Sequence, residues 1–246
     1  MAYSYDLTDR IGTQATLGLV VLQADETIEH DFRRMLPLDD VTLYITRIPS
    51  GVAVSSDSLA AMRHDLPAAA RLFPRELALD VVGYGCTSGT SVIGARAIAD
   101  LVRSGCDAGN VTEPVTSLVA ACEALNLKRI GFLSPYVAAV SDSLRATLRD
   151  AGIETPVFGG FDEGIEARVA RIAPQSIIDA AVDLAAEGGI DALFLSCTNL
   201  RTLDVIAPIE AATGLPVLSS NLVLAWDMAR KAGIALRGDW GRLSRA

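Results

Sequence analysis

The sequence predicts an α/β protein with parallel sheets, and two features of the chain point to this class. Short runs rich in valine, isoleucine and leucine alternate with longer segments of helical periodicity, which is the pattern of a parallel sheet covered by helices. The two halves of the chain also resemble each other weakly. We therefore expect two pseudo-symmetric, Rossmann-like α/β halves with the active site between them.

The apolar runs predict the strands, because buried parallel strands are short and rich in β-branched residues. Strands are expected near residues 17–22, 41–47, 78–84, 129–133, 155–158, 192–195 and 215–218. Helical periodicity places helices over residues 57–73, 91–103, 114–125, 140–151, 174–187, 203–213 and 222–232. Asp57 and Ser58 are candidate caps for the first of these helices.

The internal duplication concerns two Cys-Thr pairs at the ends of apolar strands. The strand LGLVVLQ leads on to LDVVGYG, which ends at Cys86, and RIGFLSP leads on to IDALFLS, which ends at Cys197. The separation between opening strand and cysteine is nearly the same in both halves. We expect residues 1–113 with 220–246 to form the first half and residues 114–219 the second. Ligands bind at the carboxyl ends of strands in open parallel sheets, so both cysteines are expected at one site.

Composition limits the class of ligand. The formal charge is −9 over 246 residues, whereas nucleic acids and anionic lipids require a basic surface. We expect a small-molecule partner, no nucleic acid and no membrane. No apolar run reaches the length of a membrane span and no signal peptide is evident, which favours the cytoplasm. The chain lacks close Cys-x-x-Cys pairs and nucleotide-binding fingerprints, so neither a metal nor another cofactor is expected.

The residues around each cysteine favour chemistry on a carboxylate. Cys86 opens the run CTSGT and Cys197 the run CTNLRT, both before a helical segment. Small residues let backbone N–H groups approach an anion, and a helix N-terminus favours a thiolate. A buried structural cysteine is the alternative at either position alone. Two Cys-Thr pairs at equivalent strand ends favour the catalytic interpretation, whereas Cys106 and Cys122 lack such a setting.

These two motifs resemble those of the aspartate/glutamate racemase superfamily, in its maleate cis-trans isomerase and arylmalonate decarboxylase branch. The N-terminal run LGLVVLQADETIEHDF is similar to that of the ectoine-utilisation protein A subgroup. The resemblance implies a cofactor-independent, homo-oligomeric enzyme that acts on a small carboxylate. Cys86 and Cys197 would be catalytic, as opposed acid and base in a racemase, or with Cys86 adding to the alkene in a maleate isomerase. The resemblance also implies substrate-binding roles for Thr87, Ser88, Tyr136, Thr198 and Asn199.

Two departures from the family pattern concern the substrate. Asp25 stands where maleate isomerases carry an asparagine, and the segment 162–166, which ends at Glu166, has none where a second asparagine is expected. Carboxylates there repel a dianion such as maleate and attract an ammonium group. An amino-acid derivative from ectoine degradation is therefore the expected substrate. The alternatives are that Asp25 only caps a helix starting near Thr27, that the chain is a true maleate isomerase, or that it binds a ligand without turnover.

Overall fold

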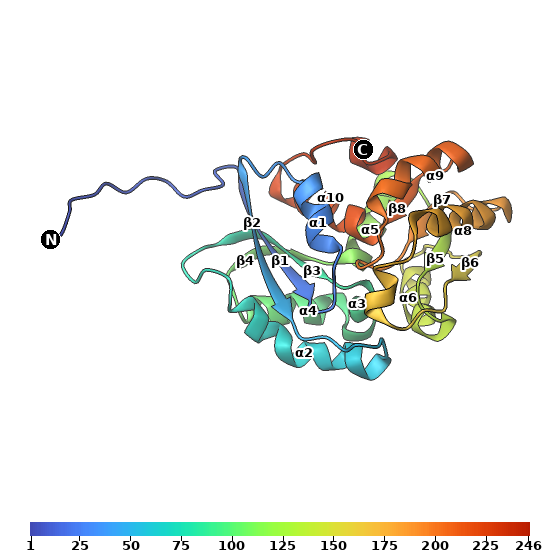
Figure 1. Ribbon diagram of the computed structural model, residues 1–246, viewed down its shortest axis with the longest axis horizontal. Coiled ribbons are helices and arrows are strands. Elements are labelled where there is room, and N and C mark those ends of the chain that lie inside the picture. Colours follow the sequence, from blue (N-terminus) through green and yellow to red (C-terminus); the bar gives the residue numbers. More distant parts are fainter.

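The chain forms two four-stranded parallel sheets with matching strand orders, which confirms the predicted fold class. The computed structural model describes residues 1–246, apart from the side chain of Ser56. The first sheet, in the order β2-β1-β3-β4, contains β1 (Ala15–Leu22), β2 (Val41–Ile48), β3 (Leu79–Gly85) and β4 (Ala108–Thr112). The second, in the order β6-β5-β7-β8, contains β5 (Ile130–Ser134), β6 (Phe158–Gly160), β7 (Ala192–Leu195) and β8 (Val217–Ser219). Figure 1 shows the two sheets side by side.

Helices connect the parallel strands, as the geometry of a parallel crossover requires. In the first half these are α1 (Ile28–Met35), α2 (Ser56–Ala70), α3 (Thr87–Ile93), α4 (Ala95–Arg103) and α5 (Pro114–Ala124). The remaining helices are α6 (Ala138–Asp150), α7 (Glu166–Val169), α8 (Pro174–Ala186), α9 (Ile206–Thr213) and α10 (Ser220–Ala232), with short 3₁₀ turns η1 (Leu203–Val205) and η2 (Arg242–Arg245). Among the described residues, no helix has the length and apolarity needed to cross a bilayer.

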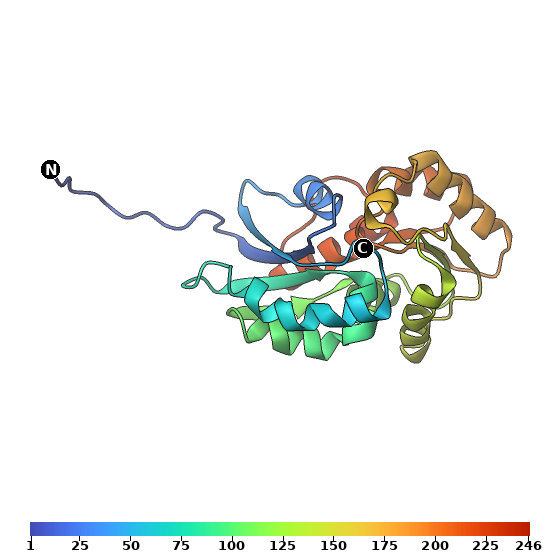
Figure 2. The same ribbon diagram turned by 60° about the horizontal axis from the view of Figure 1, so that its bottom comes forward.

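Two apolar cores hold this arrangement together. The smaller core packs α2 and α4 onto one face of the first sheet, and Figure 2 shows both helices on that outer face. The larger core joins the opposite face of the first sheet to the second sheet. The helix α10 lies inside it: residues from Ser220 to Ala229 are all buried, and the helix packs on both α5 and β3. The assignment of residues 220–246 to the first half stays a prediction that agrees with this packing.

Most predicted elements are present, and the exceptions have local causes. The predicted helix over 91–103 is two helices, α3 and α4, separated by Gly94 at φ +91° and ψ 136°, a conformation that glycine adopts readily. The strand β4 was not predicted, because Gly109 and Asn110 have low strand propensity; pairing with β3 holds it in place. The strand expected at 155–158 begins only at Phe158, after Pro156, which has no N–H to donate.

The ends of two further elements also differ from the prediction. The cap of α2 is Ser55, whose hydroxyl accepts a hydrogen bond from the N–H of Ser58; Asp57 and Ser58 instead lie within the first turn. The last predicted strand starts at Val217 rather than at residue 215. The observed cap of α2 lies two residues before Asp57 and three before Ser58, because neighbouring serines and aspartates can each satisfy a free N–H group.

Candidate active site

Cys86 lies directly after β3 and forms the N-cap of α3. Its Sγ accepts a hydrogen bond from the backbone N–H of Gly89 at 3.1 Å, and the side chain is only 5% exposed. A Cβ on Gly89 would come within 2.8 Å of both Cys86 Sγ and the Tyr84 hydroxyl. The small residues of the first motif therefore allow the helix backbone to approach the thiol closely.

Cys197 occupies the corresponding place after β7, in a strained backbone conformation. Its φ is +101°, which costs a non-glycine residue on the order of 1–3 kcal/mol and is found most often at functional sites. Its N–H donates to Ser220 Oγ at 2.9 Å, and its Sγ accepts from the N–H of Asn199 at 3.3 Å. The tertiary contacts thus hold the second thiol in a conformation that local propensity disfavours.

Both thiols face one small cavity where the carboxyl ends of the two sheets meet. Its lining includes every residue that the sequence predicted as catalytic or substrate-binding: Asp25, Cys86, Thr87, Ser88, Tyr136, Glu166, Cys197, Thr198 and Asn199. The apolar side chains of Leu22, Val54 and Leu59 complete the wall. The cavity measures about 20 Å³, little more than one water molecule requires. The structure is therefore a closed form of the site.

Tyr136 links Cys197 to Glu166. Its hydroxyl lies 3.0 Å from Cys197 Sγ and 2.7 Å from Glu166 Oε1. Ser134 holds the backbone at Tyr136 in place, since its Oγ accepts a hydrogen bond from the N–H of Tyr136 at 3.1 Å. Asn199 in turn donates from Nδ2 to Glu166 Oε2 at 2.9 Å. The amide of Asn199 is thus engaged with protein groups, and its predicted contact with substrate stays a prediction.

Asp25 has one oxygen in a helix cap and one free oxygen. Its Oδ1 accepts the N–H groups of Thr27 and Ile28, both at 2.8 Å, so the carboxylate does cap α1. Its Oδ2 is buried and has no hydrogen-bond partner among the described residues. The pKa of this carboxyl is raised to about 6, chiefly by burial and in part by the charge of Glu166, against the lowering effect of the two backbone donors and of the Thr198 hydroxyl. The cap therefore leaves one oxygen available to a ligand.

The cysteines themselves are poorly ionised in this closed form. The pKa of Cys86 is raised to about 12, chiefly by burial and in part by the charges of Glu166 and Asp25, against the lowering effect of the Gly89 N–H and the Tyr84 hydroxyl. Burial likewise raises the pKa of Cys197 well above its usual value, with Glu166 the next largest cause. Two acidic side chains beside two thiols oppose thiolate formation by simple loss of a proton to solvent.

Ser220 connects the two cysteine motifs, a role that the sequence did not predict. Its Oγ accepts hydrogen bonds from the hydroxyl of Thr87 at 2.8 Å and from the N–H of Cys197 at 2.9 Å. The neighbouring Ser219 is the cap of α10, and a serine pair at a helix start is fully explained by capping. No local signal separates the two serines, so only the tertiary structure shows that Ser220 connects both motifs.

A loop from the first half closes over the cavity. The N–H of Val54 donates to the carbonyl of Gly164 at 3.2 Å, and the N–H of Glu166 donates to the carbonyl of Val52 at 3.3 Å. These bonds form an isolated antiparallel bridge between Ala53 and Ile165. We call residues 50–55 the closing loop. Val54 lines the cavity from this loop, so the bridge holds one wall of the site in place.

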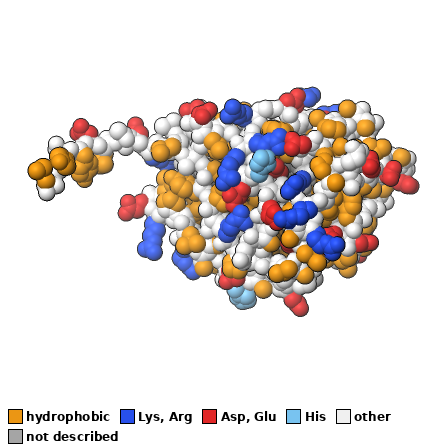
Figure 3. Space-filling model, viewed as in Figure 1, with side chains coloured by type: hydrophobic (Ala, Val, Ile, Leu, Met, Phe, Trp, Pro, Cys, Tyr) orange, Lys and Arg blue, Asp and Glu red, His pale blue; other side chains and the backbone are white. Residues whose placement is uncertain are grey.

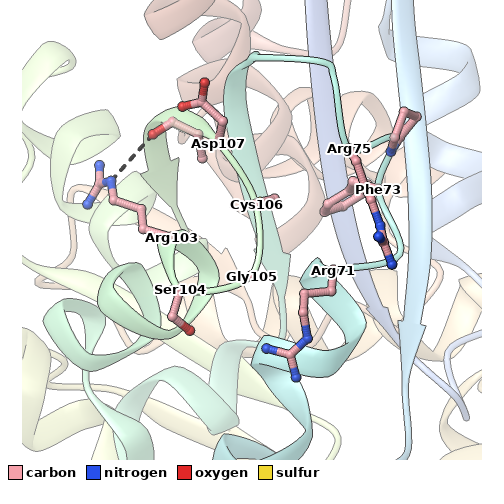
Figure 4. Close-up of a pocket in the computed structure, with 10 residues that line it drawn as sticks. Arg71, Phe73, Arg75, Arg103, Ser104, Gly105, Cys106 and Asp107 are labelled. Atoms are coloured by element: carbon pink, nitrogen blue, oxygen red, sulfur yellow. Dashed lines mark hydrogen bonds between the residues drawn. The ribbon is translucent and has the colours of Figure 1, made fainter.

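Other surface features do not share this chemistry. A wider pocket, about 570 Å³, lies at the opposite end of the first sheet, between the segment after α2 and the turn from α4 to β4. Figure 4 shows that its side chains Arg71, Arg75 and Arg103 point in different directions. Figure 3 shows basic and acidic side chains interspersed on one face, without a large patch of one sign. Among the described residues, no group of three acidic, cysteine or histidine side chains is placed to hold a metal ion.

The fold and this two-cysteine cavity define a class of α/β protein with a duplicated sheet and one site at the junction. The sequence profile of the arylmalonate decarboxylase family matches residues 93–243, and the chain belongs to this family.

Similar proteins include enzymes with two different activities. An arylmalonate decarboxylase from Bordetella bronchiseptica is 28% identical over 234 residues, which cover 93% of this chain and 95% of that protein. A maleate isomerase from Pseudomonas putida is 25% identical over 230 residues, covering 87% and 90%. The structure of a Nocardia farcinica maleate cis-trans isomerase mutant with a covalently bound succinylcysteine intermediate superposes with a TM-score of 0.83 at 24% identity, covering 94% and 98%. The likeness to the solved structure supports the fold.

Proposed function

We propose that this protein is a cofactor-independent racemase or isomerase in which Cys86 and Cys197 act on one small carboxylate. The observation that carries this proposal is the shared cavity: the two thiols follow equivalent strands of two sheets and line the same enclosed space. Thiols on two walls of one site can remove a proton from one face of a bound carbon and deliver a proton to the other.

The reaction needs stabilisation of the charge that develops on the substrate carboxylate. Thr87 and Ser88 open α3, so their backbone N–H groups have no acceptor within the helix. Thr198 brings a hydroxyl to the same cavity from the second motif. Donors fixed in an enclosed, water-poor site stabilise an enolate-like intermediate without reorganising. These groups form the proposed carboxylate cradle.

The second polar end of the substrate is proposed to be an ammonium group. Asp25 and Glu166 both line the cavity, and the free Oδ2 of Asp25 is an acceptor without a donor among the described residues. A substrate ammonium supplies that donor and offsets part of the negative charge of the two carboxylates, whereas a second carboxylate is repelled. We propose an amino-acid derivative as substrate. Its place in ectoine degradation rests on the N-terminal resemblance to the ectoine-utilisation subgroup.

Maleate cis-trans isomerisation is the second candidate, favoured by the similarity to a maleate isomerase over most of both chains. In that reaction the sulfur of Cys86 would add to the alkene, rotation about the resulting single bond would follow, and the thiolate would leave again. Decarboxylation of an arylmalonate is less favoured, because the decarboxylase branch resembled here keeps only the second cysteine.

A substrate panel distinguishes these activities. Enantiopure α-amino acids and maleate would each be incubated with the protein in D₂O and followed by NMR. Loss of optical purity with deuterium at the α-carbon supports racemisation, and fumarate formation supports the maleate reaction. Binding of an amino acid without exchange or isomerisation contradicts a catalytic role and supports a ligand-binding protein.

We also propose that the protein assembles as a homo-oligomer. The N-terminal segment extends away from the body (Figures 1 and 2) and exposes Met1, Tyr3, Tyr5, Leu7 and Ile11, each more than 80%. Exposed apolar side chains at this density are typical of interaction surfaces. Sedimentation of the full chain and of a variant lacking residues 1–11 tests the proposal. A monomeric full-length protein contradicts it.

A further inference from the structure

The hydroxyl of Tyr136 lies between a thiol and a carboxylate. Because it carries one proton, it can donate a hydrogen bond to only one of these two groups. It is 3.0 Å from Cys197 Sγ and 2.7 Å from Glu166 Oε1. A phenol has one proton to donate and can accept one in return. When Glu166 is ionised, the tyrosine must donate to the carboxylate, and the thiol of Cys197 is then the donor to the tyrosine oxygen.

We propose that Tyr136 and Glu166 form a proton relay that takes up the proton of Cys197, so that Cys197 acts as the base and Cys86 as the acid. This deepens the proposed two-cysteine function and rests on it. Tyr136 and Glu166 act as positioning and proton-holding groups for the sulfur.

The relay moves two protons and changes no net charge. The S–H bond of Cys197 breaks as its proton forms a new O–H bond on Tyr136. The original phenolic O–H bond breaks as that proton joins Glu166 Oε1. The result is a thiolate, a neutral phenol and a neutral carboxylic acid, which together carry the same single negative charge as before. The transfer therefore adds no further charge to the cavity.

Charge conservation matters because the site opposes ordinary ionisation of either thiol. A thiolate formed by loss of a proton to solvent would face an ionised Glu166 inside a buried cavity, which is costly. In the relay, the carboxylate is neutral at the moment that Cys197 is charged. The thiolate then accepts hydrogen bonds from the Tyr136 hydroxyl and from the N–H of Asn199.

The carboxylate is held in the position that the relay needs. Asn199 Nδ2 donates to Glu166 Oε2 at 2.9 Å and to the Glu166 carbonyl at 3.0 Å. This leaves Oε1 directed to Tyr136. The N–H of Glu166 is bonded to Val52 of the closing loop, so loop closure also fixes the backbone of the carboxylate.

Cys86 has no equivalent relay, and this makes the two thiols unequal. Its neighbour Tyr84 also carries a hydroxyl, which lowers the pKa of Cys86, but that hydroxyl donates to Met62 Sδ at 3.7 Å. A thioether cannot take up a proton at physiological pH, and no carboxylate is bonded to Tyr84 among the described residues. Cys86 therefore keeps its proton until a substrate carbanion accepts it.

The pH dependence of alkylation tests the relay without any turnover. Wild-type protein would be treated with iodoacetamide between pH 7 and 9, and labelling rates at Cys197 and Cys86 would be measured separately by peptide mass spectrometry. An internal transfer leaves the number of bound protons unchanged, so the Cys197 rate should vary less than about threefold across this range. The Cys86 rate should rise about tenfold per pH unit, because its thiolate forms by loss of a proton to solvent.

Two variants break the relay at different points. E166Q removes the proton acceptor, and Y136F removes the bridge while keeping the carboxylate. In both, the Cys197 rate should acquire the tenfold dependence per pH unit, with the Cys86 profile as the internal control. Either variant suffices if the other does not fold.

The contrary results are specific. A tenfold rise per pH unit at Cys197 in the wild type overturns the relay, as does a flat profile that survives Y136F. Failure of Cys197 to react while Cys86 reacts also overturns it. If the relay fails but both cysteines remain necessary for solvent exchange into substrate, the proposed function stands. If exchange fails while the flat profile is observed, the function is wrong and the relay is intact.

Discussion

The hydroxyl of Thr87 donates a hydrogen bond to Ser220 Oγ, 2.8 Å away and 133 positions along the chain. The same oxygen accepts the N–H of Cys197, so one serine connects the loops that carry both thiols. Because α10 begins at this residue, the start of the central helix also sets the relative position of the two motifs.

Replacing this serine should affect both stability and catalysis. S220A leaves the Thr87 hydroxyl and the Cys197 N–H buried without their acceptor, at a cost of about 1–3 kcal/mol each. We expect a lower free energy of unfolding and at least a tenfold drop in kcat. The matched control is S219A, which removes the cap of α10 and should cost about 1 kcal/mol with little effect on kcat. Equal activity of the two variants contradicts the connecting role of Ser220.

The raised pKa of Asp25 predicts how KM for the substrate depends on pH. With its pKa raised to about 6 by burial, the carboxylate is charged at pH 8 and loses that charge as the pH falls through 6. For a zwitterionic amino acid, KM should therefore rise on acidification. D25N keeps an oxygen to cap α1 but loses the charge, so KM at pH 8 should rise about 10- to 100-fold and lose its acid dependence. A lower KM in D25N points instead to a dicarboxylate substrate.

The closing loop predicts a reversible block of substrate entry. Ala53 and Ile165 form a non-hydrogen-bonded antiparallel pair, whose Cα atoms are typically about 4.5 Å apart and within range of a disulfide. The double variant A53C/I165C should lose at least 90% of its activity on oxidation and recover it on reduction. Single variants A53C and I165C serve as controls for oxidation of other thiols. Full activity of the oxidised double variant shows that substrate enters without opening this bridge.

Asp31 predicts a loss of stability at higher pH. This carboxyl is buried behind the second motif, where its Oδ2 accepts from Asn221 Nδ2 at 2.8 Å, and burial raises its pKa from 3.8 to about 7. The folded state therefore holds the Asp31 proton more tightly than the unfolded chain does. The protonated carboxyl contributes its full share to the free energy of unfolding below pH 4, and this share is lost as the pH rises through 7.

D31N should remove this dependence. The amide stays neutral and can still accept from Asn221, so the free energy of unfolding should fall less between pH 5 and 8 than in the wild type. The difference should be on the order of 2–4 kcal/mol. Urea denaturation at both pH values measures it. An identical pH dependence in both proteins contradicts a buried, proton-holding Asp31.

The sequence predicted the fold class and the site residues from features that are local or repeated. Two Cys-Thr pairs after apolar strands marked Cys86 and Cys197, and parallel topology then placed the ends of their strands at one junction. Tyr136 and Glu166 were identified only through resemblance to a family. Their roles as ligands of substrate, like those of the other residues of the cavity, stay predictions.

Contacts between distant residues could not be predicted in this way. The Tyr136 to Glu166 bond, the bridge from Ala53 to Ile165 and the role of Ser220 depend on how the two sheets meet, and composition and periodicity do not specify that geometry. The sequence offered two functions for Asp25, a cap and a ligand group, as alternatives. The structure shows that its two oxygens are divided: Oδ1 caps α1 and Oδ2 stays free.

The central claim is that both cysteines act on one substrate, and isotope exchange in cysteine variants tests it most directly. Wild type, C86S and C197S would each be incubated in D₂O with one enantiomer of an amino acid that the wild type racemises. C106S, whose changed residue lies in the distant surface pocket, is the control. We predict deuterium incorporation with racemisation in wild type and C106S, and a loss of racemisation of at least a hundredfold in C86S and in C197S. Racemisation at the wild-type rate by either of these two variants contradicts the account.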